Sequence, residues 1–152
     1  MQCVWGDRGR RVASSSAARR HKAHCETSSQ RVKVGVDAIE ISRIRRALER
    51  YPAFRERCFT EAERAYCDSR KNPAQSYAGR FAGKEAVGKA LGLGVARAFA
   101  WRDIEIVGRP KPSVKLSGSA LAWAERIPAG AIDLSMTHNR DLAVAVAIVE
   151  AG

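Results

Sequence analysis

Long apolar runs are missing from this sequence of 152 residues: no stretch approaches 18 consecutive apolar residues, and the N-terminus has no hydrophobic segment typical of a secretory signal. We therefore expect neither a membrane span nor secretion. The four cysteines form no C-x-x-C pair and show no zinc-binding spacing with the three histidines. We expect no structural zinc and interpret the cysteines as reduced thiols of a cytoplasmic protein.

Acidic residues are scarce relative to basic ones. The chain has 16 Asp and Glu against 27 Lys and Arg, a formal net charge of +11. Such an excess favours an anionic partner: nucleic acid, a phosphorylated small molecule or an acidic protein. Residues 1–31 carry seven of the basic residues and two acidic ones, so this segment holds +5 of the charge and the remainder holds +6.

Residues 1–31 lack sustained periodicity and have few large apolar side chains, which predicts a disordered basic extension. Three origins fit it: a basic arm for nucleic acid, an organellar transit peptide, or sequence upstream of the true start. We favour the third, because the pattern of a folded chain begins abruptly at Val32. Residues 32–152 are predicted to form one domain, since a chain of this length builds one core more readily than two.

Apolar periodicity after residue 31 predicts short strands and amphipathic helices. The expected strands cover residues 32–37, 103–107, 113–116, 131–137 and 142–149, and the expected helices cover residues 37–50, 60–69, 76–92 and 117–126. Residues 54–59 are interpreted as a short connector, and Thr60 and Glu63 have the spacing of a capping box that opens the next helix. The polar turn at residues 138–141 suits an antiparallel hairpin. The predicted fold class is therefore α+β, a single domain with a mainly antiparallel sheet and helices packed on it.

The helix predicted over residues 76–92 carries a carboxylate on its core-facing side. Glu85 falls within the apolar arc that contains Phe81 and Ala82. A carboxylate buried there needs a cation, either a lysine or a metal ion. The alternative is an ordinary ion pair with Lys89, one turn later.

Three glycines, Gly79, Gly83 and Gly88, interrupt the same helix. Each lowers helix stability by about 0.8–1 kcal/mol relative to alanine. Glycine is tolerated in a helix mainly where something approaches the backbone closely. We therefore expect close packing against this helix.

Asp37 stands where the first strand is predicted to end and the first helix to begin. Asp37 and Glu40 have the spacing of a capping box, so Asp37 has a purely structural interpretation as a helix N-cap. It can also present a carboxylate from the end of the strand to a functional site. The residues alone leave both interpretations open.

Two stretches, Val34–Ile44 (VGVDAIEISRI) and Gly79–Gly92 (GRFAGKEAVGKALG), resemble the signature segments of the 4'-phosphopantetheinyl transferases, specifically the short holo-acyl-carrier-protein synthase type. Three further segments resemble the family's linker, its first central strand and its C-terminal segment: Phe59–Glu63, Trp101–Val107 and Ser135–His138. Together they cover residues 32–147 in the expected order. The extension before Val32 is atypical, and the turn at residues 108–112 varies the family's Gly-Lys-Pro turn.

The resemblance implies a reaction and its catalytic residues. It implies transfer of the phosphopantetheine arm from coenzyme A to a serine of an acyl carrier protein, with Mg2+ as cofactor. Asp37 and Glu85 match the family's metal carboxylates, and Lys89 joins them as a catalytic residue. Mg2+ usually takes only one or two protein carboxylates besides water and substrate oxygens. The acceptor of the serine proton stays open, with Glu85 acting through a water as one candidate.

The resemblance also implies contacts to substrate and partner. Arg80, Lys84, Lys89 and His138 are expected to contact coenzyme A, although each also has an interpretation as a solvated or ion-paired side chain. Arg43 is expected to bind the acidic recognition helix of the carrier protein, on a surface extended by further arginines at 45, 46 and 50. A homotrimer with coenzyme A at the subunit boundaries is implied as well.

Two other functions compete with the transferase. A basic nucleic-acid-binding module would fit the charge, but such modules usually interleave aromatic residues with basic ones, and Trp5 is the one aromatic residue of the basic extension. We therefore do not expect nucleic acid as the partner. An inactive relative that still binds coenzyme A is the second alternative. The carrier protein would belong to fatty-acid or polyketide synthesis.

Overall fold

The computed structural model describes residues 32–93, 100–108 and 110–150. Its elements are β1 (Val32–Glu40), α1 (Ile41–Arg50), α2 (Pro52–Cys58), α3 (Glu61–Asp68), α4 (Pro73–Ala90), a 3-10 helix (Trp101–Asp103), β2 (Ile104–Val107), β3 (Ser113–Leu116), α5 (Gly118–Ala124), β4 (Ile132–His138) and β5 (Leu142–Glu150). The predicted extension over residues 1–31 lies outside the described residues. Within the described ranges, no helix is long and apolar enough to cross a membrane.

The strands form two antiparallel sheets. The larger sheet has the order β1-β5-β4, with β5 in the middle, and β2 and β3 form a separate hairpin. Val36 pairs with Val146 across β1 and β5, and Met136 pairs with Ala145 across β4 and β5. The predicted α+β class and the C-terminal hairpin are confirmed.

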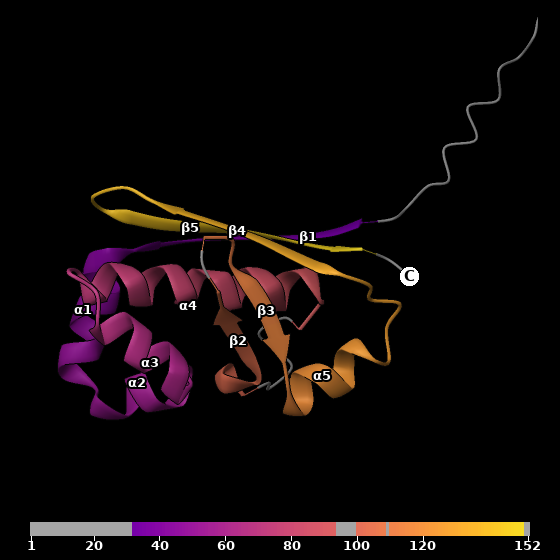
Figure 1. The fold of residues 1–152 in the computed structure, drawn as a ribbon, viewed down its shortest axis with the longest axis horizontal. Coiled ribbons are helices and arrows are strands. Elements are labelled where there is room, and N and C mark those ends of the chain that lie inside the picture. Colours follow the sequence, from indigo (N-terminus) through magenta and orange to yellow (C-terminus); the bar gives the residue numbers. More distant parts are fainter. Residues whose placement is uncertain (1–31, 94–99, 109, 151–152) are drawn as a thin grey trace, which may run out of the picture.

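Helix α4 lies lengthwise against one face of the larger sheet, and α2, α3, α5 and β2 lie on the side of α4 that faces away from the sheet (Figure 1). Small residues permit this close approach. Ala143, Ala145 and Ala147 of β5 are fully buried on the helix side. A side chain at Gly35 of β1 would collide with the carbonyl oxygen of Ala86 and lie 2.6 Å from the amide nitrogen of Ala90.

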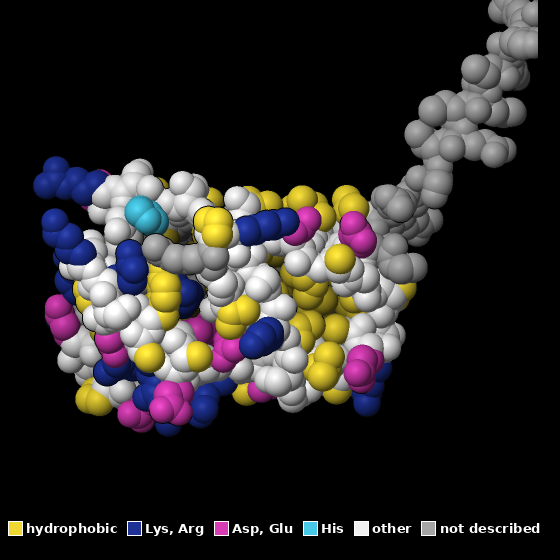
Figure 2. Space-filling model, in the orientation of Figure 1, with side chains coloured by type: hydrophobic (Ala, Val, Ile, Leu, Met, Phe, Trp, Pro, Cys, Tyr) yellow, Lys and Arg dark blue, Asp and Glu magenta, His cyan; other side chains and the backbone are white. Residues whose placement is uncertain are grey.

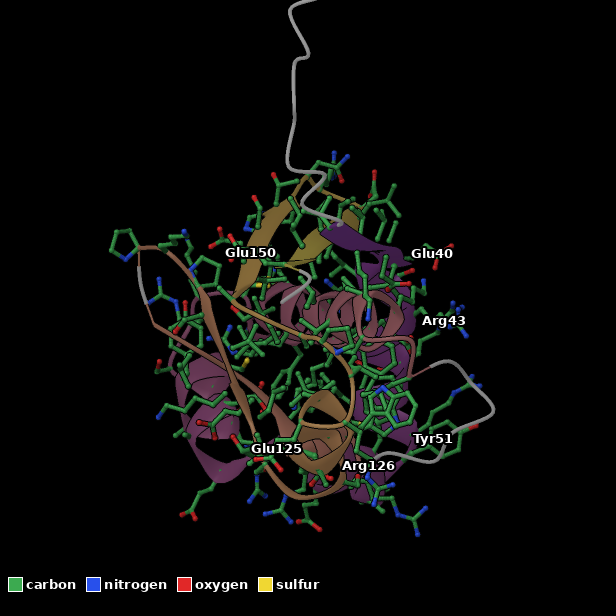
Figure 3. All side chains as sticks on the ribbon, turned by 90° about the vertical axis from the view of Figure 1, so that its right-hand side faces the viewer. Glu40, Arg43, Tyr51, Glu125, Arg126 and Glu150 are labelled. Atoms are coloured by element: carbon green, nitrogen blue, oxygen red, sulfur yellow. The ribbon has the colours of Figure 1, made fainter. Side chains whose placement is uncertain are left out.

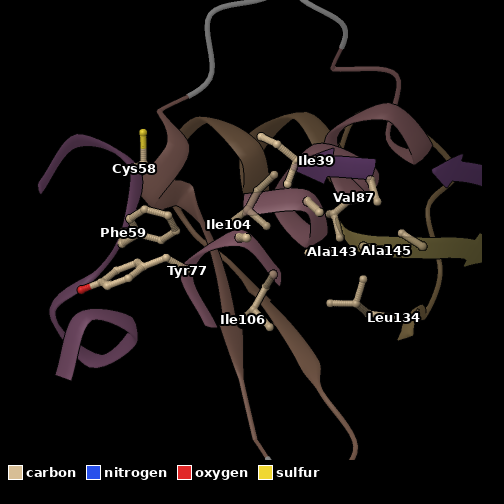
Figure 4. Close-up of a cluster of buried hydrophobic side chains, with 14 of the residues drawn as sticks. Ile39, Cys58, Phe59, Tyr77, Val87, Ile104, Ile106, Leu134, Ala143 and Ala145 are labelled. Atoms are coloured by element: carbon tan, nitrogen blue, oxygen red, sulfur yellow. The ribbon is translucent and has the colours of Figure 1, made fainter. Parts of the chain in front are cut away.

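The core continues from α4 to the helices and the hairpin (Figure 4). The rings of Phe59 and Tyr77 pack edge to face with their centroids 4.8 Å apart. A Cβ at Gly83 would collide with Ile106 of β2. The close packing expected at the glycines is therefore confirmed at Gly83, whereas a Cβ at Gly79 would have nothing within 4 Å.

Two predicted elements were wrong. Strand β1 continues through Glu40, because its residues pair with β5 as far as Glu40 with Leu142, and α1 begins only at Ile41. Asp37 is consequently a strand residue and not a helix N-cap. Residues 52–58 form α2 instead of a connector, with Pro52 at the first helical position, where its missing N–H is tolerated.

The capping box predicted at the start of α3 is confirmed. The amide of Glu63 donates to the hydroxyl of Thr60, and the amide of Thr60 donates to the Glu63 carboxylate at 2.9 Å. The Glu63 side chain is buried and its other oxygen accepts from the amide of Ile106 at 3.0 Å. The cap therefore also ties α3 to β2.

The outer face of the larger sheet is apolar and exposed. Val32, Val34 and Val36 of β1 are each more than half exposed, and Ile148 of β5 pairs with Val34 on the same face. No described element covers this face in Figure 1, and Figure 2 shows hydrophobic side chains along the corresponding edge of the molecule. An exposed apolar face of this kind marks an interaction surface.

Candidate active site

Asp37 and Lys89 meet where β1 crosses α4. The Lys89 ammonium lies 2.8 Å from Oδ1 of Asp37 and donates to the carbonyl of Val36 at 2.9 Å. Asp37 is mostly buried, and Lys89 remains about half exposed. The pairing of β1 with β5 and the glycine at position 35 bring these side chains together.

Glu85 lies one turn before Lys89 and completes the cluster. Burial raises the pKa of Glu85, the Asp37 carboxylate raises it further, and Lys89 opposes the rise. Asp37 and Glu85 are therefore close enough to repel each other. Among the described ion pairs, Lys89 binds Asp37, so the i,i+4 pair with Glu85 that the sequence left open is replaced by a contact between distant segments.

The donor set of this cluster fits a hard cation. Two carboxylates that repel each other in a partly buried setting gain stability from a cation between them. Within the described ranges, no group of three or more His, Cys, Asp and Glu side chains could hold a metal ion. A metal here would therefore have Asp37 and Glu85 as its protein ligands. Two carboxylates are sufficient for Mg2+, which is usually bound by one or two of them together with water and substrate oxygens.

Arg80 and His138 line a second region, a hollow of about 510 Å³ between α3, α4, β4 and the turn after β2. Tyr66, Gln75 and Ser76 line it as well. The structure thus brings together the two coenzyme A residues predicted at 80 and 138. The sequence analysis did not identify Tyr66 as a residue of this hollow. The available indication was its place in α3 one turn after Glu63, on the same side of the helix.

Lys84 lies elsewhere. Its side chain is 0% exposed, and its ammonium is 2.6 Å from the Glu63 carboxylate and 2.9 Å from the carbonyl of Trp101. Burial lowers the pKa of Lys84, while the ion pair with Glu63 acts in the opposite direction. Because Lys84 is enclosed between α3, α4 and the 3-10 helix, we do not include it among the residues that face a substrate.

The surface around α1 combines arginines with an apolar groove. Arg43 is exposed on α1 and lies on the same side of the molecule as Tyr51 (Figure 3). A groove of about 470 Å³ follows the end of α1, lined by Tyr51, Phe54 and Trp101, with Arg50 also lining it. The sequence missed this groove because α2 was interpreted as a connector.

The carboxylate cluster and the hollow lie at opposite edges of the larger sheet. Asp37 belongs to β1 at one edge, His138 belongs to β4 at the other, and β5 lies between them. Adjacent strands are about 4.8 Å apart, so the two edges are separated by about 10 Å. Each region presents its own set of side chains.

Comparison with known proteins adds the family. The sequence profile of the 4'-phosphopantetheinyl transferase superfamily matches residues 33–147. A holo-[acyl-carrier-protein] synthase of Rhizobium leguminosarum is 46% identical over 127 residues, covering 79% of this chain and 95% of the relative. One from Moorella thermoacetica is 46% identical over 123 residues, covering 78% and 94%.

Solved structures agree with the sequence match. A complex of ACPS with CoA from Chronobacterium ammoniagenes superposes with a TM-score of 0.70 at 25% identity, covering 81% of this chain and 99% of that one. The holo-[acyl-carrier-protein] synthase of Helicobacter pylori in complex with coenzyme A gives a TM-score of 0.66 at 30% identity, covering 76% and 98%. The resemblance found in the sequence is confirmed, and the chain belongs to the 4'-phosphopantetheinyl transferase superfamily.

Proposed function

We propose that this protein transfers the 4'-phosphopantetheine arm of coenzyme A to a serine of an apo acyl carrier protein and releases adenosine 3',5'-bisphosphate. One observation carries the assignment: in a chain of this family, Lys89 of α4 binds Asp37 of β1, distant in sequence, and Glu85 lies one turn before Lys89 within electrostatic range of Asp37. Neither helix capping nor a local ion pair requires that arrangement.

The reaction transfers a phosphoryl group. The serine oxygen forms a bond to the phosphorus next to pantetheine, the bond from that phosphorus to the bridging oxygen breaks, and the nucleotide leaves with the electron pair. Asp37 and Glu85 would hold Mg2+, and the bound ion would supply positive charge for the phosphate oxygens. The Lys89 ammonium is exposed enough to bind a phosphate as a point charge.

Coenzyme A is proposed to contact both regions of the chain, but at different subunits. Arg80 and His138 face the hollow, whereas Asp37 and Glu85 lie at the other edge of the sheet. A neighbouring copy that brings its β4 edge to the β1 edge would join the two sets. The exposed apolar sheet face supplies surface for such an association, and we propose the homotrimer implied by the family.

The arginine surface and the groove are proposed to bind the carrier protein. Arg43 and Arg50 would attract an acidic helix, and exposed charges of this kind raise the association rate at low salt. Tyr51 and Phe54 of the groove would accept apolar side chains from the same helix. An amphipathic acidic helix fits this combination of charge and apolar surface.

A reducing, cytoplasmic setting is proposed from the two described cysteines, which are both free. Cys58 and Cys67 are buried, and burial raises the pKa of their thiols to about 11 and about 12. Thiols that stay protonated at neutral pH are poorly reactive. Neither cysteine is therefore proposed to take part in the chemistry.

The test is an intact-mass assay with the full chain, coenzyme A, Mg2+ and apo carrier protein. We expect the carrier to gain one phosphopantetheine arm, and a chelator to prevent the gain. Asp37→Ala and Glu85→Ala should abolish transfer in folded protein. Glu125→Ala, which removes an exposed carboxylate at the end of α5, is the matched control and should stay active. No mass gain with the folded wild-type chain would refute the proposed function.

A further inference from the structure

Arg80 is a buried cation whose charge is incompletely satisfied. The residue is 7% exposed, and its Nε has no hydrogen-bond partner among the described residues. The ion pairs found in the described ranges involve other cations, and the buried Glu63 is occupied by Lys84. Taking a cation out of water is unfavourable unless an anion compensates its charge. Arg80 also lines the hollow, so an anion there would compensate its buried charge.

The ring of Tyr66 stacks on this guanidinium. The central carbon of the Arg80 guanidinium lies 3.8 Å from the ring centroid, well within cation–π range. Tyr66 and Arg80 line the hollow together. A guanidinium covered on one face by a ring keeps the N–H groups at its edge for an anion, because these groups lie in the guanidinium plane.

Contacts between α3 and α4 on both sides of Tyr66 set its position. Before Tyr66 in α3, Glu63 pairs with Lys84 of α4. After it, Asp68 accepts a hydrogen bond from the hydroxyl of Tyr77 of α4 at 2.8 Å. The contact between Tyr66 and Arg80 lies between these two. Both flanking contacts fix the two helices relative to each other, so the ring is held over the guanidinium by α3 and not by α4 itself.

We propose that Tyr66 is a positioning residue that holds the Arg80 guanidinium with its N–H edge towards the hollow, where it binds a phosphate group of coenzyme A. The proposal rests on the proposed function and adds to it a residue outside the family signature segments. Tyr66 acts through Arg80 and touches no reacting atom. Its loss should therefore weaken coenzyme A binding without slowing the chemical step.

The experiment compares Tyr66→Leu with Tyr66→Phe, which keeps the ring. Tyr66→Leu should raise KM and Kd for coenzyme A about 5- to 30-fold, as expected for a cation–π contact of ~1–2 kcal/mol, while kcat stays within about twofold. Tyr66→Phe should stay close to wild type. KM and kcat come from the intact-mass assay, and Kd comes from calorimetry with the full chain and coenzyme A.

Two further arms assign the effect. In an Arg80→Gln background, Tyr66→Leu should add nothing, since the ring acts through the guanidinium. Dephospho-coenzyme A lacks the 3'-phosphate: a penalty that disappears with this probe places the contact at the 3'-phosphate, and a penalty that persists places it at the diphosphate. Either result supports the phosphate subsite.

Results with the Tyr66 variants test the positioning role, whereas results with the wild-type chain test the proposed function. A folded Tyr66→Leu variant with unchanged KM and Kd refutes the positioning role, as does an equal loss in the Arg80→Gln background. If Tyr66→Leu does not fold, Tyr66→Trp with Arg80→Lys still measures the coupling between the two side chains, and additive effects refute it. If the wild-type chain itself neither binds coenzyme A nor modifies the carrier, the proposed function fails first.

Discussion

Replacing Gly35 by alanine tests the contact that places β1 against α4. The added Cβ would collide with the carbonyl oxygen of Ala86 and lie 2.6 Å from the amide nitrogen of Ala90. Both obstacles are backbone atoms, which cannot rotate away as a flexible side chain can. The strand must therefore move away from the helix, and Asp37, two residues later, must move with it.

The expected loss of stability is at the upper end of the range for overpacked sites. Overpacking costs about 1–3 kcal/mol, and the backbone contacts place Gly35→Ala near ~3 kcal/mol. For a domain of this size the melting temperature should fall by about 10 °C. Because the displacement also moves Asp37 away from Lys89, whose ammonium it binds, the folded variant should transfer phosphopantetheine more slowly.

Gly79→Ala is the matched control for stability. Gly79 also lies in a packed element, α4, but a Cβ there would meet nothing within 4 Å. Alanine is favoured over glycine inside a helix by about 0.8–1 kcal/mol, so this variant should melt a few degrees higher than wild type. Circular dichroism melts measure both variants. The reasoning is refuted if Gly35→Ala is as stable as wild type, or if both variants shift in the same direction.

Three further predictions concern charged groups. Lys84→Met leaves the buried Glu63 carboxylate without its cation, so urea unfolding should show a loss of about 3–5 kcal/mol, reduced when Glu63→Gln is added; a larger loss in the double variant would contradict this. Glu85→Gln should stabilise the metal-free protein at neutral pH, because burial and a neighbouring carboxylate raise the pKa of Glu85. Below the pKa of Glu85 in the unfolded chain, about 4, the carboxyl is protonated in both states and does not destabilise the fold; as the pH rises through the higher pKa of the folded state, the carboxylate forms and destabilises it. Urea titrations should therefore show that the extra stability of Glu85→Gln disappears in acid. Extra stability that grows in acid would contradict the prediction. Lys111→Met removes an exposed ion pair with Asp133 and should change the free energy of unfolding by no more than about 1 kcal/mol in the same assay. A larger loss would contradict this prediction.

Local patterns in the sequence predicted the elements whose determinants lie a few residues apart. The capping box of Thr60 and Glu63 depends on neighbouring side chains and backbone amides, and the hairpin of β4 and β5 depends on a short polar turn. The ordered signature segments likewise pointed to the family. These features need no knowledge of where distant segments lie.

Distant contacts decided the remainder. Asp37 is a strand residue because β5 pairs with β1 along its whole length, and this pairing overrides a local capping pattern. Lys84 and Glu85 are adjacent on one helix, yet Lys84 is buried against Glu63 of α3, while Glu85 stays partly exposed within electrostatic range of Asp37 of β1. Periodicity alone could not assign these directions.

Patterns in the sequence therefore indicate the family, the order of most elements and the residue types available for the chemistry. The folded chain sets which of these residues come into contact: Lys89 with Asp37, and Tyr66 with Arg80. The physical reason is that helix and turn preferences act over a few residues, whereas the environment of a charge depends on whichever segment packs against it.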